Sequence, residues 1–127
     1  MGGTETILLA EDHESIREMA RQTLESLGYH VLSAADGEEA LRLAEHARPA
    51  LAILDVIMPK MGGSAAAAKL AQRCPGVHVV FTSGYSSESE IVPEGTAGRY
   101  LQKPYSPTTL ARLVREILDE KIIRSDV

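Results

Sequence analysis

Short apolar runs alternate along the chain with segments whose apolar residues recur at helical spacing. A continuous apolar run of about four to eight residues is typical of a strand that is buried on both faces of a sheet. Residues 7–10 form such a run and predict a β-strand, and we expect further strands at residues 29–34, 51–55, 77–82 and 99–102. We therefore expect five strands that are separated by helices.

The first two intervening segments contain start and stop signals of helices. Apolar residues over 16–27 repeat every three or four positions, and Gly28 is expected to end that helix in a left-handed conformation. Asp36 and Glu39 have the spacing of a capping box. The helix that they open is expected to carry its apolar residues as far as Ala47.

The remaining segments predict one clear helix, one weak helix and a final helix. Residues 64–73 are rich in alanine at helical spacing, and Ser106 is a good N-cap before Pro107. Residues 86–98 contain few apolar side chains, so we expect a short or frayed helix there. Strict alternation of strands and helices predicts a parallel sheet that is covered on both faces through right-handed crossovers.

The composition narrows the possible classes of function. The 127 residues fit a single domain, and 44% hydrophobic with 24% charged residues is typical of a globular protein. A net charge of −5 and a scarcity of aromatic residues disfavour a dedicated nucleic-acid binder. No apolar run approaches the roughly 20 residues of a membrane span, and the N-terminus lacks the features of a secretory signal. Cys74 is the single cysteine, which fits a reducing cytoplasm.

Residues that can carry chemistry follow four of the predicted strands. Glu11 and Asp12 come after the first strand, Asp55 ends the third, Ser83 follows the fourth and Lys103 follows the fifth. Ligands of open parallel sheets bind outside the carboxyl ends of the strands, so we expect these side chains to converge. We assign none of the four histidines to the site.

Three carboxylates and one ammonium group suit phosphoryl chemistry. Carboxylate oxygens are the ligands that Mg²⁺ prefers, and a divalent cation offsets the mutual repulsion of clustered acids. An aspartate beside Mg²⁺ and a lysine can attack phosphorus, because both cations offset charge on the phosphoryl oxygens. A nearby hydroxyl at Ser83 would then bond a phosphoryl oxygen.

Four motifs in order carry a resemblance to a known family. They are ILLAED at 7–12, LDVIMPKMGG at 54–63, FTSGY at 81–85 and YLQKP at 100–104. The chain resembles the receiver, or phosphoacceptor, domain of two-component response regulators, and the resemblance covers roughly residues 5–119. The combination of FTSGY with QKPY is most similar to receivers of hybrid histidine kinases. The resemblance implies a doubly wound, flavodoxin-like α/β fold with five parallel strands in the order 2-1-3-4-5.

The resemblance also implies roles for individual residues. Asp55 matches the phosphorylated aspartate, Lys103 the phosphate-binding lysine, and Ser83 with Tyr100 the pair that switches conformation. The implied ligands of Mg²⁺, besides Asp55, are Asp12 directly, Glu11 more often through water, and the main-chain carbonyl of Ile57. Pro104 matches a proline that commonly follows a cis peptide bond.

Two further positions are implied to set the lifetime of the acyl phosphate. They lie two residues after the phosphoacceptor and two residues after the switch hydroxyl, at Ile57 and Tyr85. Ile57 offers no hydrogen bond to an attacking water, and the Tyr85 ring can crowd its approach. We expect slow self-dephosphorylation.

The expected function is to accept a phosphoryl group on Asp55 from a histidine kinase or a histidine phosphotransfer domain, in the cytoplasm. We expect residues 5–121 to form the receiver, 1–4 a flexible leader and 122–127 a tail, as a monomer or weak homodimer. The domain would not be a turnover enzyme beyond hydrolysing its own phosphate.

The alternative is a Mg²⁺-dependent phosphohydrolase with an aspartate nucleophile, which generally needs a second acid where this chain has Ile57. A degenerate receiver and a flavin-binding domain fit less well.

Overall fold

The computed structural model describes residues 2–84 and 99–125, with side chains as far as 119. The expected helix within 86–98 lies outside the described residues. The elements are β1 (Thr6–Ala10), α1 (Glu14–Ser26), β2 (His30–Ala34), α2 (Gly37–Ala44), β3 (Leu51–Asp55), α3 (Gly63–Arg73), β4 (His78–Ser83), β5 (Arg99–Gln102) and α5 (Pro107–Ser125).

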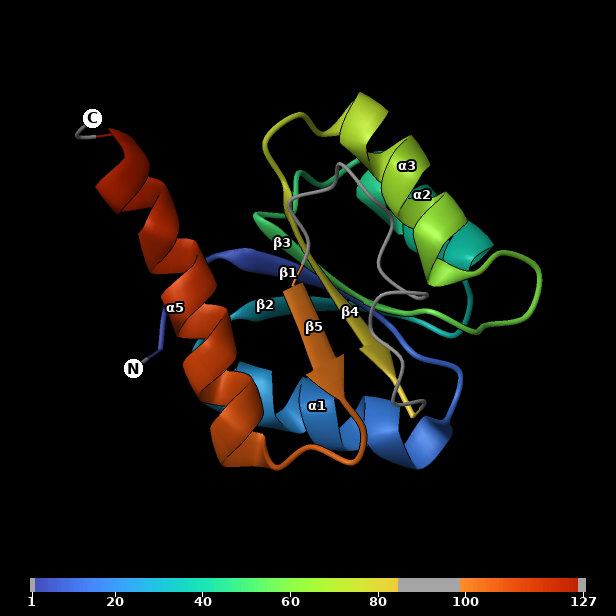
Figure 1. Cartoon of the computed structure of the whole chain (residues 1–127), viewed down its shortest axis with the longest axis horizontal. Coiled ribbons are helices and arrows are strands. Elements are labelled where there is room, and N and C mark those ends of the chain that lie inside the picture. The colour runs from blue at the N-terminus through green and yellow to red at the C-terminus, as the bar shows by residue number, and fades with distance from the viewer. Residues whose placement is uncertain (1, 85–98, 126–127) are drawn as a thin grey trace.

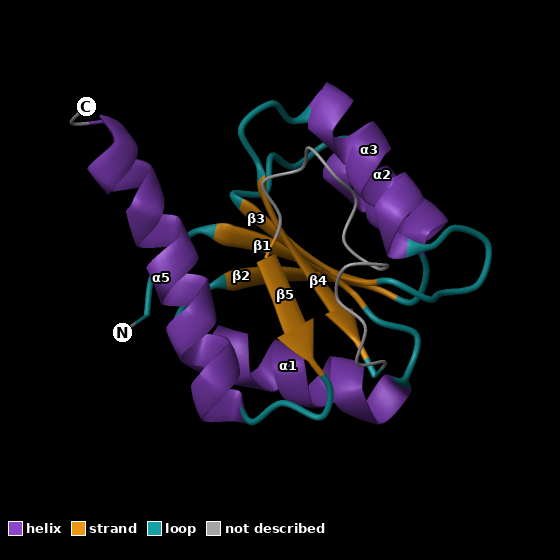
Figure 2. Ribbon diagram, in the orientation of Figure 1, coloured by secondary structure: helices purple, strands orange, loops and turns teal. Residues whose placement is uncertain are grey.

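The five strands form one parallel sheet in the order β2-β1-β3-β4-β5, as the resemblance implied. Helices α1 and α5 cover one face of the sheet, and α2 and α3 cover the other (Figure 1). Figure 2 shows the strands as a twisted central layer between these two pairs of helices. The fold is therefore the doubly wound, flavodoxin-like α/β arrangement.

The core consists of two apolar layers because successive side chains of a strand point to opposite faces. From β1, Ile7 and Leu9 pack toward α1 and α5, whereas Leu8 and Ala10 pack toward α2 and α3. The layer under α2 and α3 is rich in alanine, and small side chains allow these helices to approach the sheet closely. Because both faces are covered, the central strand β3 is buried along its whole length.

Local hydrogen bonds explain where the first two helices begin and end. Gly28 has a φ of +99°, and its N–H donates to the carbonyl of Glu25 at the end of α1. The side chain of Asp36 accepts from the N–H of Glu39, which confirms the predicted N-cap of α2. The expectation that α2 reaches Ala47 is wrong, because the helix ends at Ala44, where the next N–H donates in a tighter turn.

The last helix begins as predicted, with Ser106 accepting from the N–H of Thr109. The peptide bond between Lys103 and Pro104 is cis. Within residues 2–84 and 99–125, no helix has the length and apolar character that crossing a membrane requires.

Candidate functional site

The carboxyl ends of four strands bring the candidate residues to one edge of the sheet. β1 and β3 pair in parallel register, so Glu11 follows β1 at the level of Asp55, the last residue of β3. Ser83 ends β4, and Lys103 directly follows β5. A pocket of about 370 Å³ opens at this edge, and Asp12, Asp55, Ser83 and Lys103 contribute to its lining.

Lys103 bridges two buried carboxylates. Its Nζ lies 2.8 Å from Oδ2 of Asp55 and 3.2 Å from Oε2 of Glu11, and it donates a hydrogen bond to each. Glu11 is 1% exposed and Asp55 is 4% exposed, so both acids are almost completely removed from water. Charged groups this deeply buried are tolerated only when they are paired and hydrogen-bonded, which makes Lys103 the central cation of the site.

Burial and charge shift the pKa values of this cluster. Burial is the largest cause that raises the pKa of Asp55 to about 6; the negative charge of Glu11 adds to it, and hydrogen bonding to Lys103 opposes it. For Lys103, burial acts to lower the pKa, but hydrogen bonds to Asp55 and Glu11 outweigh it and raise the pKa overall. Lys103 therefore stays protonated, while Asp55 is poorly stabilised as an anion by the protein alone.

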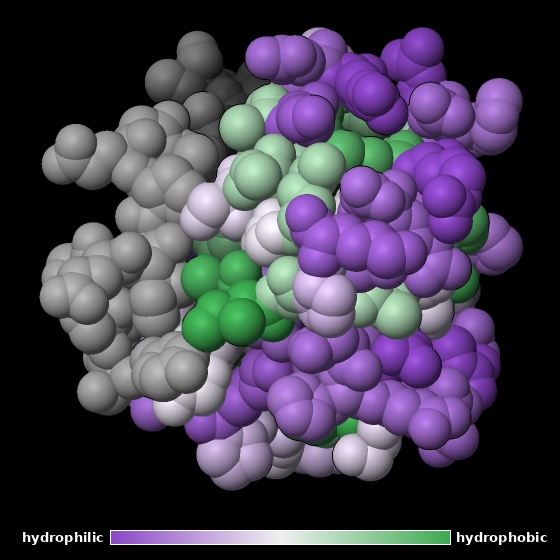
Figure 3. All heavy atoms as spheres, turned by 90° about the vertical axis from the view of Figure 1, so that its right-hand side faces the viewer, coloured by the Kyte–Doolittle hydropathy of each residue, from purple (hydrophilic) through white to green (hydrophobic). Residues whose placement is uncertain are grey.

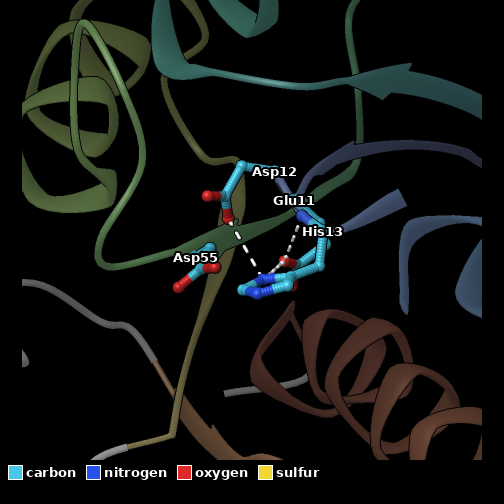
Figure 4. Close-up of side chains that lie close together, drawn as sticks. All are labelled: Glu11, Asp12, His13 and Asp55. Atoms are coloured by element: carbon cyan, nitrogen blue, oxygen red, sulfur yellow. Dashed lines mark hydrogen bonds and ion pairs between the residues drawn. The ribbon is translucent and has the colours of Figure 1, made fainter. Parts of the chain in front are cut away.

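The acids at the end of β1 leave oxygen atoms without donors. Figure 4 shows Glu11, Asp12, His13 and Asp55 gathered at one point, and one ligand atom from each lies within 4.8 Å of all the others. Oδ1 of Asp12 and Oε1 of Glu11 are buried and accept no hydrogen bond from the residues that the structure describes, although Nζ of Lys103 lies 3.0 Å from the Glu11 oxygen. Converging acid oxygens that lack donors fit a hard divalent cation such as Mg²⁺.

Neighbouring groups hold the acids in place. Nη1 of Arg17, on α1, donates to the main-chain carbonyl of Glu11 over 2.8 Å. The N–H of Ile57 donates to Oδ1 of Asp55 over 3.3 Å. Gly63 lies against the backbone of Asp55, because a Cβ at this glycine would lie 2.5 Å from the Asp55 carbonyl oxygen. The first turn of α3 can therefore approach the site only through a residue without a side chain.

Ser83 links β4 to its neighbour through its carbonyl oxygen. That atom accepts from the N–H of Lys103 over 2.9 Å and from the hydroxyl of Tyr100 over 3.4 Å. The Tyr100 ring packs beside the apolar layer under α2 and α3. The structure thus joins both residues of the expected switch and the backbone of Lys103 through one carbonyl oxygen.

The structure describes one of the two positions that are expected to control dephosphorylation. Ile57 lines the pocket and is 57% exposed. Among the described residues, it is the large hydrophobic side chain that is exposed to solvent. Figure 3 shows a face on which several small hydrophobic areas lie between larger hydrophilic ones. Tyr85 lies outside the described residues.

Sequence interpretation missed His13 and Arg17. His13 received no role, but the structure places its Nδ1 3.3 Å from Oε2 of Glu11 and 3.6 Å from Oδ1 of Asp12. The signal that was available is position, because His13 directly follows the acid pair and precedes α1. Arg17 lies one helical turn later, where its side chain can reach back over the start of the helix.

The comparison with protein families agrees with this geometry. The model of the response regulator receiver domain matches residues 7–115, which is most of the chain. The chain belongs to the response regulator receiver domain family. A curated relative, the alkaline phosphatase synthesis transcriptional regulatory protein PhoP of Bacillus subtilis, is 37% identical over 114 residues. The match covers 88% of this chain and 48% of PhoP, so this receiver domain spans about half the length of that relative.

Solved structures of receiver domains are similar along most of the chain. A CheY-like response regulator receiver domain protein from Methanospirillum hungatei aligns with a TM-score of 0.86 at 30% identity, covering 96% of this chain and 99% of that one. The receiver domain from the hybrid histidine kinase CckA aligns with a TM-score of 0.71 at 38% identity, covering 89% and 98%. A receiver of a hybrid histidine kinase is therefore among its similar structures, as the motifs indicated.

Proposed function

We propose that this receiver accepts a phosphoryl group on Asp55 within a two-component phosphorelay. The observation that carries the proposal is the placement of Asp55. Its carboxylate is buried at the end of β3, its Oδ2 lies 2.8 Å from Nζ of Lys103, and Oδ1 of Asp12 nearby has no donor among the described residues. Phosphoryl transfer needs a nucleophilic carboxylate that lies beside a fixed cation and beside an acid oxygen that is free to bind a metal ion.

Glu11, Asp12, Asp55 and the main-chain carbonyl of Ile57 would hold Mg²⁺. The ion, when bound, supplies positive charge against the phosphoryl oxygens and against the three acids. Lys103 supplies a second positive charge, 2.8 Å from Oδ2 of Asp55. The two cations together favour the ionised form of Asp55, which counteracts the burial that raises its pKa.

In the transfer step, a carboxylate oxygen of Asp55 attacks phosphorus, and the bond from phosphorus to the donor's imidazole nitrogen breaks. The donor keeps that electron pair, and the aspartate becomes an acyl phosphate. We propose that Lys103 then pairs with a phosphoryl oxygen and that the Ser83 hydroxyl bonds another. The Tyr100 ring would turn into the space that the Ser83 hydroxyl leaves. This movement would shift the populations of two conformations of the domain.

The donor is proposed to be a histidine kinase or a histidine phosphotransfer domain in the cytoplasm. The similarity to the receiver of the hybrid histidine kinase CckA supports this donor class. Residues 5–121 would form the receiver unit, which acts as a signalling phosphoacceptor and releases its own phosphate slowly.

The test is labelling with acetyl phosphate in the presence of Mg²⁺, followed by intact mass measurement. We expect one added phosphate on the wild type, none on Asp55→Asn and none on the wild type in EDTA. Asp119→Asn is the matched control, because Asp119 is an acid on α5 that pairs with Arg115 and lies away from the pocket. Equal labelling of Asp55→Asn would refute the proposal, and continuous hydrolysis of a generic phosphate ester would favour the phosphohydrolase instead.

A further inference from the structure

His13 gives the acidic site a nitrogen ligand that its carboxylates lack. The side chain follows Asp12 at the start of α1 and is 66% exposed. Its carbonyl accepts the first hydrogen bond of the helix, from the N–H of Arg17 over 2.9 Å, so the backbone is anchored. The ring makes no capping hydrogen bond to the helix, and it can turn without disturbing α1.

The distances are those of ligands around one ion. One nitrogen of His13 and one oxygen each of Glu11, Asp12 and Asp55 lie within 4.8 Å of one another (Figure 4). Octahedral ligands at about 2.1 Å from a common centre lie about 3 to 4.2 Å apart, so only small side-chain rotations are needed. A second observation points to a ligand: Oδ1 of Asp12 is buried and accepts no hydrogen bond from the described residues, whereas Oε1 of Glu11, which is 1% exposed, has Nζ of Lys103 3.0 Å away.

We propose that His13 is an additional ligand for divalent transition ions such as Zn²⁺ and Ni²⁺, and that it takes little part in binding Mg²⁺. Imidazole nitrogen suits Zn²⁺ and Ni²⁺, whereas Mg²⁺ prefers oxygen and keeps several waters. The inference rests on the proposed function, because both concern the same cation site. The identity of the ion in this site would then depend on which divalent cations are available.

His13 has to exchange one interaction to bind an ion. In the structure its Nδ1 lies 3.3 Å from Oε2 of Glu11, an oxygen that also accepts from Nζ of Lys103 and from the N–H of His13. Glu11 therefore keeps two donors when the ring turns to the ion. The ring proton can reside on Nε2, because the side chain is largely exposed to water.

The test is calorimetric titration of untagged protein with Zn²⁺ and, separately, with Mg²⁺, at about pH 8, where imidazole is neutral. We expect His13→Gln to lower the affinity for Zn²⁺ at least about tenfold, which is the scale that even an outer partner of a metal ligand contributes. The affinity for Mg²⁺ should fall far less. His46→Gln is the matched control, because it removes an exposed imidazole beyond α2.

A second measurement follows the ring nitrogens by NMR. Zn²⁺ should shift one ring nitrogen of His13 strongly and leave His46 unchanged, whereas Mg²⁺ should shift neither. Equal Zn²⁺ affinity in His13→Gln and wild type, or no shift at His13, would overturn the inference. Labelling of the wild type by acetyl phosphate with Mg²⁺ is independent of these results, so its failure would overturn the proposed function alone.

Discussion

Replacing Asp55 by asparagine should stabilise the metal-free protein at neutral pH. Folding buries this carboxyl group and raises its pKa from 3.8 to about 6, because burial and the charge of Glu11 outweigh the attraction of Lys103. At 1.36 kcal/mol per pKa unit, a shift of about two units makes the ionised form about 3 kcal/mol less favourable in the folded state. Asparagine resembles the protonated form, since it is neutral and keeps an oxygen that can accept from Lys103.

The effect should depend on pH with a defined sign. Between about pH 4 and pH 6 the folded wild type binds more protons at Asp55 than the unfolded chain does, so its stability falls as the pH rises through this window. The variant lacks this contribution. We therefore expect the two proteins to have similar stability near pH 4, and the variant to be more stable by about 1–3 kcal/mol at pH 7.5.

Urea unfolding followed by far-UV circular dichroism measures this difference, and EDTA keeps the site free of metal. The midpoint should move while the slope stays constant, as expected when stability alone changes. Asp119→Asn is the control, because it alters an acid outside the pocket and should change stability by no more than about 1 kcal/mol. Adding Mg²⁺ should stabilise the wild type more than Asp55→Asn and narrow the gap. A variant that is no more stable than wild type at pH 7.5, or a gap that does not change with pH, would refute the reasoning.

Three further predictions concern the metal, the switch and the lifetime of the phosphate. Asp12→Ala should weaken Mg²⁺ binding at least about tenfold more than Glu11→Ala, because a direct ligand contributes more than a water-mediated one; similar affinities by calorimetry would contradict the assigned ligands. Ser83→Ala should reduce at least about twofold the change that phosphorylation causes in the NMR signals of the Tyr100 ring, and an undiminished change would exclude this route. Ile57→Asn should speed decay of the acyl phosphate about tenfold, or about 1.4 kcal/mol of barrier, when intact mass is followed over time; unchanged decay would show that water access is not controlled there.

The sequence predicted the fold and the location of the site well because both depend on repeating patterns. Apolar runs placed Asp55 and Ser83 at strand ends, and parallel strands bring their carboxyl ends to one edge. The order of the strands came from the resemblance, because alternation of strands and helices leaves several orders open. The end of α2 was predicted too late, since Ala47 fits the helical pattern and only the local turn after Ala44 excludes it.

The chemistry at the site depended on distances that a pattern does not contain. The position of the His13 ring depends on its side-chain torsions as well as on its backbone angles at the start of α1, where φ is −79° and ψ is 116°. The raised pKa of Asp55 follows from its depth and from the negative charge of Glu11. Neither quantity can be derived from spacing along the chain.

The shared hydrogen bonds at the carbonyl of Ser83 have a mechanical consequence. One oxygen atom accepts from both the backbone N–H of Lys103 and the hydroxyl of Tyr100, so a displacement of the last peptide of β4 would act on both residues together. This linkage runs through the main chain and survives removal of the Ser83 hydroxyl. The change in the Tyr100 NMR signals that remains in Ser83→Ala therefore measures the contribution of the backbone. The part of the change that is lost measures the contribution of the Ser83 hydroxyl.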